Sequence, residues 1–149
     1  MRLRPSSGPR PGPGPPEFLV DRSLSQVLLP AELRRAGLTV HTLPGALGDQ
    51  AARELPDADW IALAGERGWV VLTRDDRLRL RPAARQAITG GKVRVFCLAT
   101  AGLSFAGQAS YLVANRLRII RAARQPGPYV YSVYRDRIRK LWPDVRSPM

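Results

Sequence analysis

Short apolar runs, each followed by a polar or glycine-containing segment, recur along the chain from residue 17 to residue 134. The clearest is Trp69–Thr73, which follows Gly68 and holds no charged residue. Such a run predicts a strand that is buried on both faces of a sheet. Further strands are predicted at 17–21, 38–43 and 93–98. The run 129–134 is aromatic and β-branched, and it predicts a strand at a sheet edge.

Amphipathic stretches separate these runs. The segment 24–33 has helical spacing, and Pro30 within it predicts either one kinked helix or two short ones. Residues 44–56 contain prolines and glycines without an apolar period, so they predict a loop. Asp57 then precedes an amphipathic helix that ends at Gly68, and it is well placed to cap that helix.

The second half of the chain continues this alternation. Pro82 suits the first turn of a short helix. Ser104 can cap one long helix from Phe105 to about Arg124, and a loosely ending tail carries Trp142. Strands that alternate with helices predict an α/β fold, in which helices cover a parallel or mostly parallel sheet through right-handed crossovers.

The two ends differ in composition from the middle. Residues 1–16 hold six prolines, three glycines and two serines, which bury too little apolar surface to offset the entropy of ordering. We therefore predict a disordered basic leader at 1–16, one domain at 17–143 and a loose tail at 144–149. No apolar run approaches the ~20 residues of a membrane span, and Arg2 and Arg4 are followed by Pro and Gly, so we do not expect residues 1–16 to be a secretory signal. With Cys97 as its single cysteine, the chain has no internal disulfide, and we expect a cytoplasmic protein.

Carboxylates follow the predicted strands at one edge of the sheet. Asp21 ends the first strand, and Asp75 comes two residues after the third. The helix that Asp57 begins follows the second strand, so its start also lies near this edge, where open parallel sheets bind ligands. Turns also favour Asp, which is the alternative explanation for Asp75 and Asp76. Clustered carboxylates repel one another unless a hard cation such as Mg²⁺ is bound, so the pattern predicts a metal site.

The chain has 24 Lys and Arg residues against 12 Asp and Glu residues, a net charge of +12. Every basic residue except Lys92 and Lys140 is an arginine, whose planar guanidinium suits phosphate. This excess predicts attraction to a polyanion, with biased codon usage as the alternative explanation. The arginines expected to contact RNA near the acidic site are Arg22, Arg74, Arg77 and Arg79, and the set beside Asp75 continues to Arg81 and Arg85. Farther along, the stripe Arg118, Arg121 and Arg124 is more typical of a solvated helix face.

Three segments, in order, resemble the PIN-like domain family and its VapC-type branch, the toxins of bacterial type II toxin–antitoxin pairs. They are Phe18-Leu19-Val20-Asp21, Asp57-Ala58-Asp59-Trp60-Ile61 and Val71-Leu72-Thr73-Arg74-Asp75. The resemblance covers roughly residues 17–100, and more weakly the chain to about 143. It implies a three-layer α/β/α sandwich and a ribonuclease that uses Mg²⁺ or Mn²⁺. The matching catalytic and metal-binding residues are Asp21, Asp57 and Asp75, and the implied partners are RNA, a cognate antitoxin and, as a further option, a second copy of the chain.

The chain departs from the family pattern beyond these three positions. Many PIN domains carry a Glu in the second segment, where Glu54 and Asp59 are the candidates here. Related small domains often have an acidic residue two positions after the last Asp, where this chain has Arg77. Glu54, Asp59 and Asp76 therefore all stay open as a further ligand. A catalytically diverged RNA-binding or protein-interaction module is the alternative function. A phosphoacceptor receiver domain is disfavoured because no lysine ends a late predicted strand.

Overall fold

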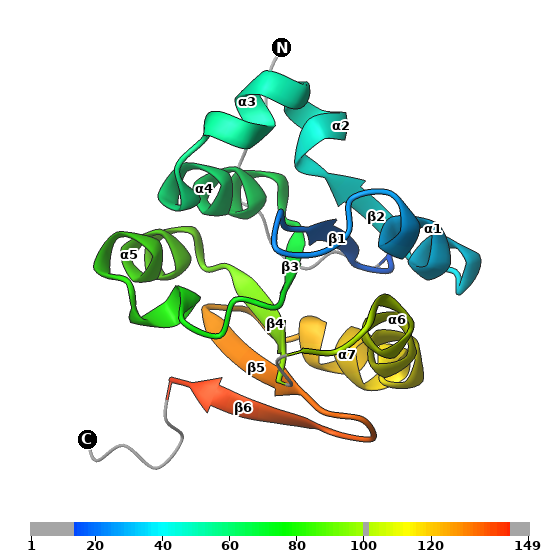
Figure 1. The fold of residues 1–149 in the computed structure, drawn as a ribbon. Coiled ribbons are helices and arrows are strands. Elements are labelled where there is room, and N and C mark those ends of the chain that lie inside the picture. Colours follow the sequence, from blue (N-terminus) through cyan, green and yellow to red (C-terminus); the bar gives the residue numbers. More distant parts are fainter. Residues whose placement is uncertain (1–13, 100–101, 144–149) are drawn as a thin grey trace.

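Six strands form one sheet in the part of the chain that the structure describes, in the order β2-β1-β3-β4-β5-β6 (Figure 1). The computed structural model describes residues 14–99 and 102–143. The strands are β1 (Glu17–Val20), β2 (Thr39–Thr42), β3 (Val70–Thr73), β4 (Arg94–Leu98), β5 (Tyr129–Val133) and β6 (Ile138–Trp142). The first five are parallel and β6 is antiparallel, which confirms the mostly parallel sheet. Most of the predicted leader and the whole tail at 144–149 lie outside the described residues.

Helices cover both faces of the sheet, which confirms the three layers (Figure 1). One face packs against α1 (Leu28–Arg35), α6 (Phe105–Ala114) and α7 (Arg116–Ala123). The other packs against α2 (Leu43–Leu47), α3 (Asp49–Glu54), α4 (Asp57–Arg67) and α5 (Pro82–Gly91), with the short 3-10 helix η1 (Leu78–Leu80) between β3 and α5. Within the described ranges, no helix has both the length and the apolar character needed to cross a bilayer.

Strand β3 occupies the middle of the sheet, as its unbroken apolar run predicts. All of its residues are buried. Val70 and Leu72 belong to the core beneath α1, α6 and α7, whereas Val71 packs in the opposite core. Truncating a buried leucine to alanine costs about 2–5 kcal/mol. This packing holds the end of β3, and the polar residues that follow it, in a defined position.

The loop predicted at 44–56 is wrong, because α2 and α3 occupy most of it. Thr42 caps α2, since its hydroxyl accepts the Gly45 N–H at 3.0 Å. Pro44 lies in the first turn of α2, where its missing N–H leaves no hydrogen bond unmade. Gly48, at φ +89°, separates the two helices. Proline and glycine therefore mark the ends of short helices here.

The predicted long helix is in fact two helices, α6 and α7, separated at Asn115. The Asn115 side chain is fully buried. Its amide group donates to the carbonyl oxygens of Tyr111 at 2.9 Å and Tyr134 at 2.7 Å. A side-chain amide that bonds to backbone groups competes with regular helix. Because Tyr134 is distant in sequence, a local apolar pattern could not reveal this break.

The strand predicted at a sheet edge, β5, lies inside the sheet because β6 pairs with its outer side. Trp142, which we placed in a loose tail, is the last residue of β6. The edge strand carries exposed charged residues, which discourage pairing with another chain. Other local predictions agree with the structure: Pro82 begins α5 and Ser104 caps α6.

Candidate active site

Asp21 and Asp75 leave neighbouring strands at the same edge of the sheet. Strands β1 and β3 are paired in parallel, with Val20 opposite Leu72. The backbone N–H of Asp21 donates to the Leu72 carbonyl at 3.0 Å, so the ladder extends to the carboxylate-bearing residue. Asp75 follows β3 by two residues. The topology therefore places these two residues side by side, as parallel strands require.

Two hydroxyl groups connect Asp21 to the backbone before Asp75. Asp21 Oδ1 accepts the Ser23 N–H at 2.9 Å and the Ser23 hydroxyl in a short hydrogen bond. Because Ser23 gives its one hydroxyl proton to Asp21, the Thr73 hydroxyl must be the donor in the 3.2 Å contact between their oxygens. Thr73 Oγ1 in turn accepts the Asp75 N–H at 3.0 Å. This chain of hydrogen bonds orients the end of both strands.

The Asp21 carboxylate is buried, with only 2% of the residue exposed. Burial raises the pKa of Asp21, the linked hydroxyl groups of Ser23 and Thr73 oppose that rise, and the nearby Asp75 carboxylate adds to it. Among the described residues, no ion pair to Asp21 is recorded, and the recorded hydrogen bonds reach only Oδ1. The site thus contains a poorly compensated buried acid, which a cation would stabilise.

Asp57 begins α4 but does not cap it, so that expectation was wrong. It is the first helical residue, after Pro56. Its Oδ1 accepts the indole N–H of Trp60 at 2.9 Å and lies 3.3 Å from the guanidinium of Arg22. A negative charge is still favourable in the first turn because the helix dipole is positive there.

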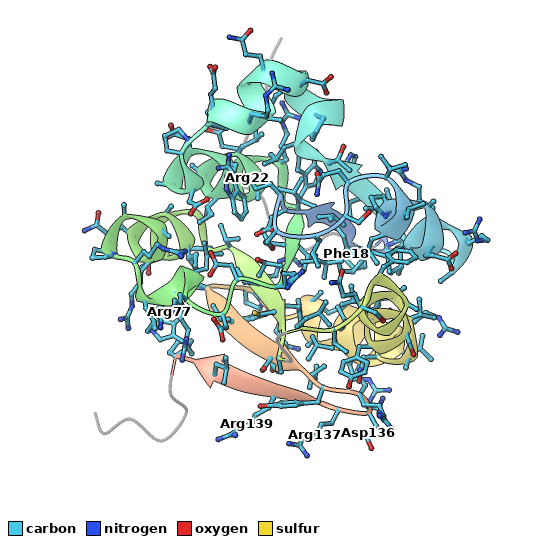
Figure 2. All side chains as sticks on the ribbon, viewed as in Figure 1. Phe18, Arg22, Arg77, Asp136, Arg137 and Arg139 are labelled. Carbon is cyan, nitrogen blue, oxygen red and sulfur yellow. The ribbon has the colours of Figure 1, made fainter. Side chains whose placement is uncertain are left out.

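Arg22 is held by backbone carbonyls as well as by Asp57. Its guanidinium donates at 3.1 Å to the carbonyls of Ala52 and Arg53, and in a short bond to that of Leu55. These carbonyl groups lie at the end of α3 and just before α4, and Figure 2 labels the Arg22 side chain. Arg22 therefore braces the connection that positions Asp57. Its predicted contact with RNA would have to be made from this braced position.

Arg81 belongs to the arginine set expected beside the acidic site, but its pairing with the acids was not predicted. Its Nη1 lies 2.6 Å from Asp75 Oδ2 and 3.8 Å from Asp57 Oδ2. Those two carboxylate oxygens can therefore be no farther apart than the sum of these distances. The contact with Asp75 raises the pKa of Arg81. Its position in an arginine-rich segment, six residues after Asp75, was the available signal, but the pairing depends on how the chain turns between β3 and α5.

The other candidate ligands lie outside this group. Asp59 and Asp76 are exposed. Glu54 is also exposed, and its carboxylate accepts a 3.4 Å hydrogen bond from Gln50. His41 stacks on Trp69 at 4.2 Å between ring centroids, and its Nε2 lies 2.7 Å from Glu17 Oε1, away from the acidic group. Cys97 is a buried core residue, and burial raises the pKa of its thiol to about 12.

The donor atoms suit a hard cation, although they are not arranged as a finished metal site. In the described part of the chain, no three Asp, Glu, His or Cys side chains form a group that could hold a metal ion. Asp21, Asp57 and Asp75 offer carboxylate oxygens, which Mg²⁺ and Mn²⁺ prefer. The Arg81 guanidinium already lies between two of them, so this position stabilises positive charge.

The three other predicted RNA-binding arginines lie near this edge. Arg74 and Arg77 are exposed and Arg79 is half-buried. Arg77 lies on the connection between β3 and η1, where Figure 2 labels its side chain. The Arg77 N–H donates to Asp75 Oδ1 at 3.0 Å, and Arg79 donates to the Asp76 carbonyl at 3.2 Å. The turn that carries the arginines is thus tied to the carboxylate beside it.

This sheet, with acidic side chains at the ends of adjacent parallel strands, is the arrangement expected of PIN-like domains. The chain matches the family "PIN like domain" over residues 16–100, and it belongs to that family. PIN ribonucleases generally use a divalent metal ion. These findings confirm the resemblance that the three sequence segments indicated.

One relative is a protein of Mycobacterium tuberculosis (strain ATCC 25618 / H37Rv) that carries the name "Putative ribonuclease VapC45". It is 34% identical to this chain over 124 residues, which cover 83% of the chain and 90% of the relative. No solved structure matches the chain. The matched length of 124 residues exceeds the 85 residues that the family covers.

Proposed function

We propose that this protein is a metal-dependent endoribonuclease, the toxin of a bacterial type II toxin–antitoxin pair, which hydrolyses RNA phosphodiester bonds. The observation that carries the proposal is the placement of Asp21 and Asp75 on adjacent parallel strands, with Asp57 joined to Asp75 through Arg81. Membership of the PIN-like family and similarity to a protein named as a ribonuclease support the same activity.

Asp21, Asp57 and Asp75 would hold Mg²⁺ or Mn²⁺, with Asp59, Asp76 and Glu54 as further candidates. When bound, such an ion supplies Lewis-acid stabilisation of charge on the phosphoryl oxygens. The protein contributes the orientation of the acids. Ser23 and Thr73 fix the Asp21 carboxylate, and the Arg77 N–H fixes one oxygen of Asp75. Asp21 is the most buried of the three, so it gains most from a neutralising cation.

Arginines beside the acids would hold the RNA backbone. Arg74, Arg77 and Arg79 all lie within four residues of Asp75. Contacts with phosphate position a strand without reading its sequence. The function also implies RNA as substrate, an antitoxin protein as partner, and a cytoplasmic location.

A catalytically diverged RNA-binding or protein-interaction module is the second candidate. It is favoured by one observation: the described residues contain no ready group of three metal ligands, and a guanidinium lies where a cation would bind. The deciding experiment is cleavage of a mixed RNA substrate by the purified protein with Mg²⁺, with Mn²⁺ and with a chelator. Cleavage that requires the metal supports the ribonuclease, whereas binding without cleavage in any condition supports the module.

We expect the affinity for RNA to fall steeply as salt rises. The reason is the net charge of +12 and the arginines beside the site. Release of counterions gives a slope of roughly −0.7 in log affinity against log salt for each phosphate neutralised on a single strand. Fluorescence anisotropy with labelled single-stranded RNA, measured at several salt concentrations in chelator, tests this prediction. An affinity that does not change with salt would contradict it.

A further inference from the structure

Arg81 differs from the other arginine at the acidic site in how firmly it is held. The Arg22 guanidinium is engaged by three carbonyls in addition to Asp57. Among the described residues, the Arg81 guanidinium contacts only the carboxylates of Asp75 and Asp57. Its side chain is 47% exposed. It can therefore leave the site by rotating its side chain, without moving a helix or strand.

The position of Arg81 conflicts with a bound metal ion. Its Nη1 lies 2.6 Å from Asp75 Oδ2, and a metal ligand would use the same oxygens at about 2 Å from the ion. Two cations that share carboxylate oxygens at such distances repel each other strongly. Metal bound at these same oxygens therefore competes with the contact of Arg81.

We propose that Arg81 is a built-in counter-ion of the acidic site, which divalent metal must displace from Asp57 and Asp75. Without metal, the guanidinium neutralises two carboxylates that would otherwise repel each other. With metal, Arg81 is released at the mouth of the site, where its planar fork is free to contact a phosphate of the RNA. This inference rests on the proposed metal site, and it assigns Arg81 the role of a positioning residue.

The proposal is tested by measuring Mn²⁺ binding directly, by electron paramagnetic resonance of free Mn²⁺ in titrations of metal-free protein. The variant is Arg81→Gln, and the matched control is Arg85→Gln. Arg85 is one helical turn farther along, stacks on Trp142 at 5.2 Å, and has no recorded carboxylate partner in the described ranges. Each change removes one positive charge from the same region, so the long-range electrostatic effect is matched.

We expect Arg81→Gln to bind Mn²⁺ about tenfold more tightly than Arg85→Gln, as removal of a charge-assisted hydrogen bond to the acids would give. We also expect Arg81→Gln to melt at a lower temperature than the control in chelator. Added Mn²⁺ should remove this difference in melting temperature. Equal or weaker Mn²⁺ binding by Arg81→Gln overturns the proposal.

A third variant, Asp75→Asn, separates this result from a failure of the metal site itself. If Asp75→Asn loses Mn²⁺ binding while Arg81→Gln matches its control, the site stands and the role of Arg81 is wrong. If neither the wild-type protein nor any variant binds Mn²⁺, the proposed metal site and the proposed role of Arg81 are both wrong.

A second, independent observation concerns the turn between β5 and β6, which lies outside the residues that the family matches. The Tyr134 N–H donates to the Arg137 carbonyl at 2.8 Å and closes the turn. The buried Asn115 amide donates to the carbonyls of Tyr134 at 2.7 Å and Arg135 at 3.4 Å. A turn secured by a buried side chain is already ordered, which lowers the entropy cost of binding.

This anchored turn exposes a concentration of positive charge. Arg135, Arg137 and Arg139 are exposed, and only Asp136 among the residues between them is acidic. The ion pairs recorded in the described residues include none of these three arginines. The guanidinium of Arg137 lies 4.4 Å from the centre of the Tyr134 ring. Figure 2 shows the labelled side chains of Arg137 and Arg139 extending from this end of the sheet.

Strand register relates this turn to the acidic site. One row of paired residues crosses the sheet from β3 to β6. It consists of Thr73, which is two residues before Asp75, then Cys97, Ser132 and Arg139. Three strand spacings of about 4.8 Å separate the ends of this row, or roughly 14 Å. The turn itself follows β5 at the same edge of the sheet as Asp21 and Asp75. A single strand of RNA leaving the acidic site along this edge would reach the three arginines.

We infer that the β5–β6 turn, with Arg135, Arg137 and Arg139, binds single-stranded RNA next to the acidic site. The arginines would contact phosphates, and Tyr134 with Arg137 would offer a stacking surface for a base. This inference rests on RNA being the substrate, but not on metal or on cleavage.

The test uses labelled single-stranded RNA and anisotropy in an Asp75→Asn background, which prevents cleavage. The double variant Arg137→Gln/Arg139→Gln is compared with Arg121→Gln/Arg124→Gln, which removes the same charge from exposed positions at the end of α7. We expect Arg137→Gln/Arg139→Gln to weaken RNA binding. The slope of log affinity against log salt should become shallower by roughly 0.7 for each phosphate that the protein no longer neutralises. Arg121→Gln/Arg124→Gln should leave this slope near that of the parent. Equal effects of the two pairs overturn the inference. If the parent itself binds no RNA, the substrate assignment and this inference both fail.

Discussion

Asp75→Asn is expected to abolish RNA cleavage, with a loss of at least about 100-fold, while the fold is retained. Altering groups that only support a metal ligand commonly costs 10–100-fold in affinity or activity, so a ligand should cost at least as much. The fold is retained because the Asn oxygen can still accept the Arg77 N–H that Asp75 Oδ1 accepts at 3.0 Å. The amide cannot balance the charge of a divalent ion.

The measurement combines RNA cleavage with Mg²⁺ or Mn²⁺ and thermal melting in chelator. Arg81 pairs with Asp75 in the structure, so the substitution removes an attraction as well as a repulsion between acids. We therefore expect only a small change in melting temperature. Asp49→Asn is the matched control, because Asp49 is an exposed aspartate that is not among the candidate ligands. Cleavage at the wild-type rate by Asp75→Asn would remove this residue from the mechanism, and an unfolded variant would assign it a structural role.

Asp21→Asn is expected to abolish cleavage as well, and to stabilise the metal-free protein at neutral pH. Asp21 is buried, and its pKa is raised from the ordinary value of 3.8. The folded state therefore binds the Asp21 proton more tightly than the unfolded state does. As pH rises from 3.8 towards the raised pKa, the free energy of unfolding falls. Above that pKa, the decrease in the free energy of unfolding is complete, and it no longer changes with pH. An Asn at this position carries no charge, so the variant avoids this loss.

Melting of both proteins in chelator over a series of pH values tests the sign. The difference in melting temperature, variant minus wild type, should grow as pH rises above 3.8 and level off beyond the Asp21 pKa. Other carboxylates titrate in both proteins, so the comparison isolates Asp21. Added Mg²⁺ or Mn²⁺ should stabilise wild type and leave Asp21→Asn nearly unchanged. A variant that is less stable than wild type at every pH would show that the buried carboxylate is compensated in the folded state.

Local pattern was sufficient for the central strands and for the edge of the sheet at which Asp21, Asp57 and Asp75 lie. The unbroken run before Thr73 predicts a buried strand, and consecutive βα units make the sheet parallel. Parallel strands end at the same edge, so Asp21 and Asp75 had to lie there. The short helices after β2 were missed because Pro and Gly were taken as marks of a loop, although both also begin and end helices.

Long-range pairing was beyond the reach of the sequence. The break at Asn115 exists because its amide reaches the Tyr134 carbonyl, and β5 is internal because β6 returns beside it. The site itself depends on such contacts, since Arg22 binds carbonyls about thirty residues away and Arg81 lies between Asp57 and Asp75. Apolar periodicity determines which face of an element is buried. The partner of each exposed charge is decided only when the folded chain brings distant segments together, and so the charge balance of this acidic site belongs to the tertiary structure.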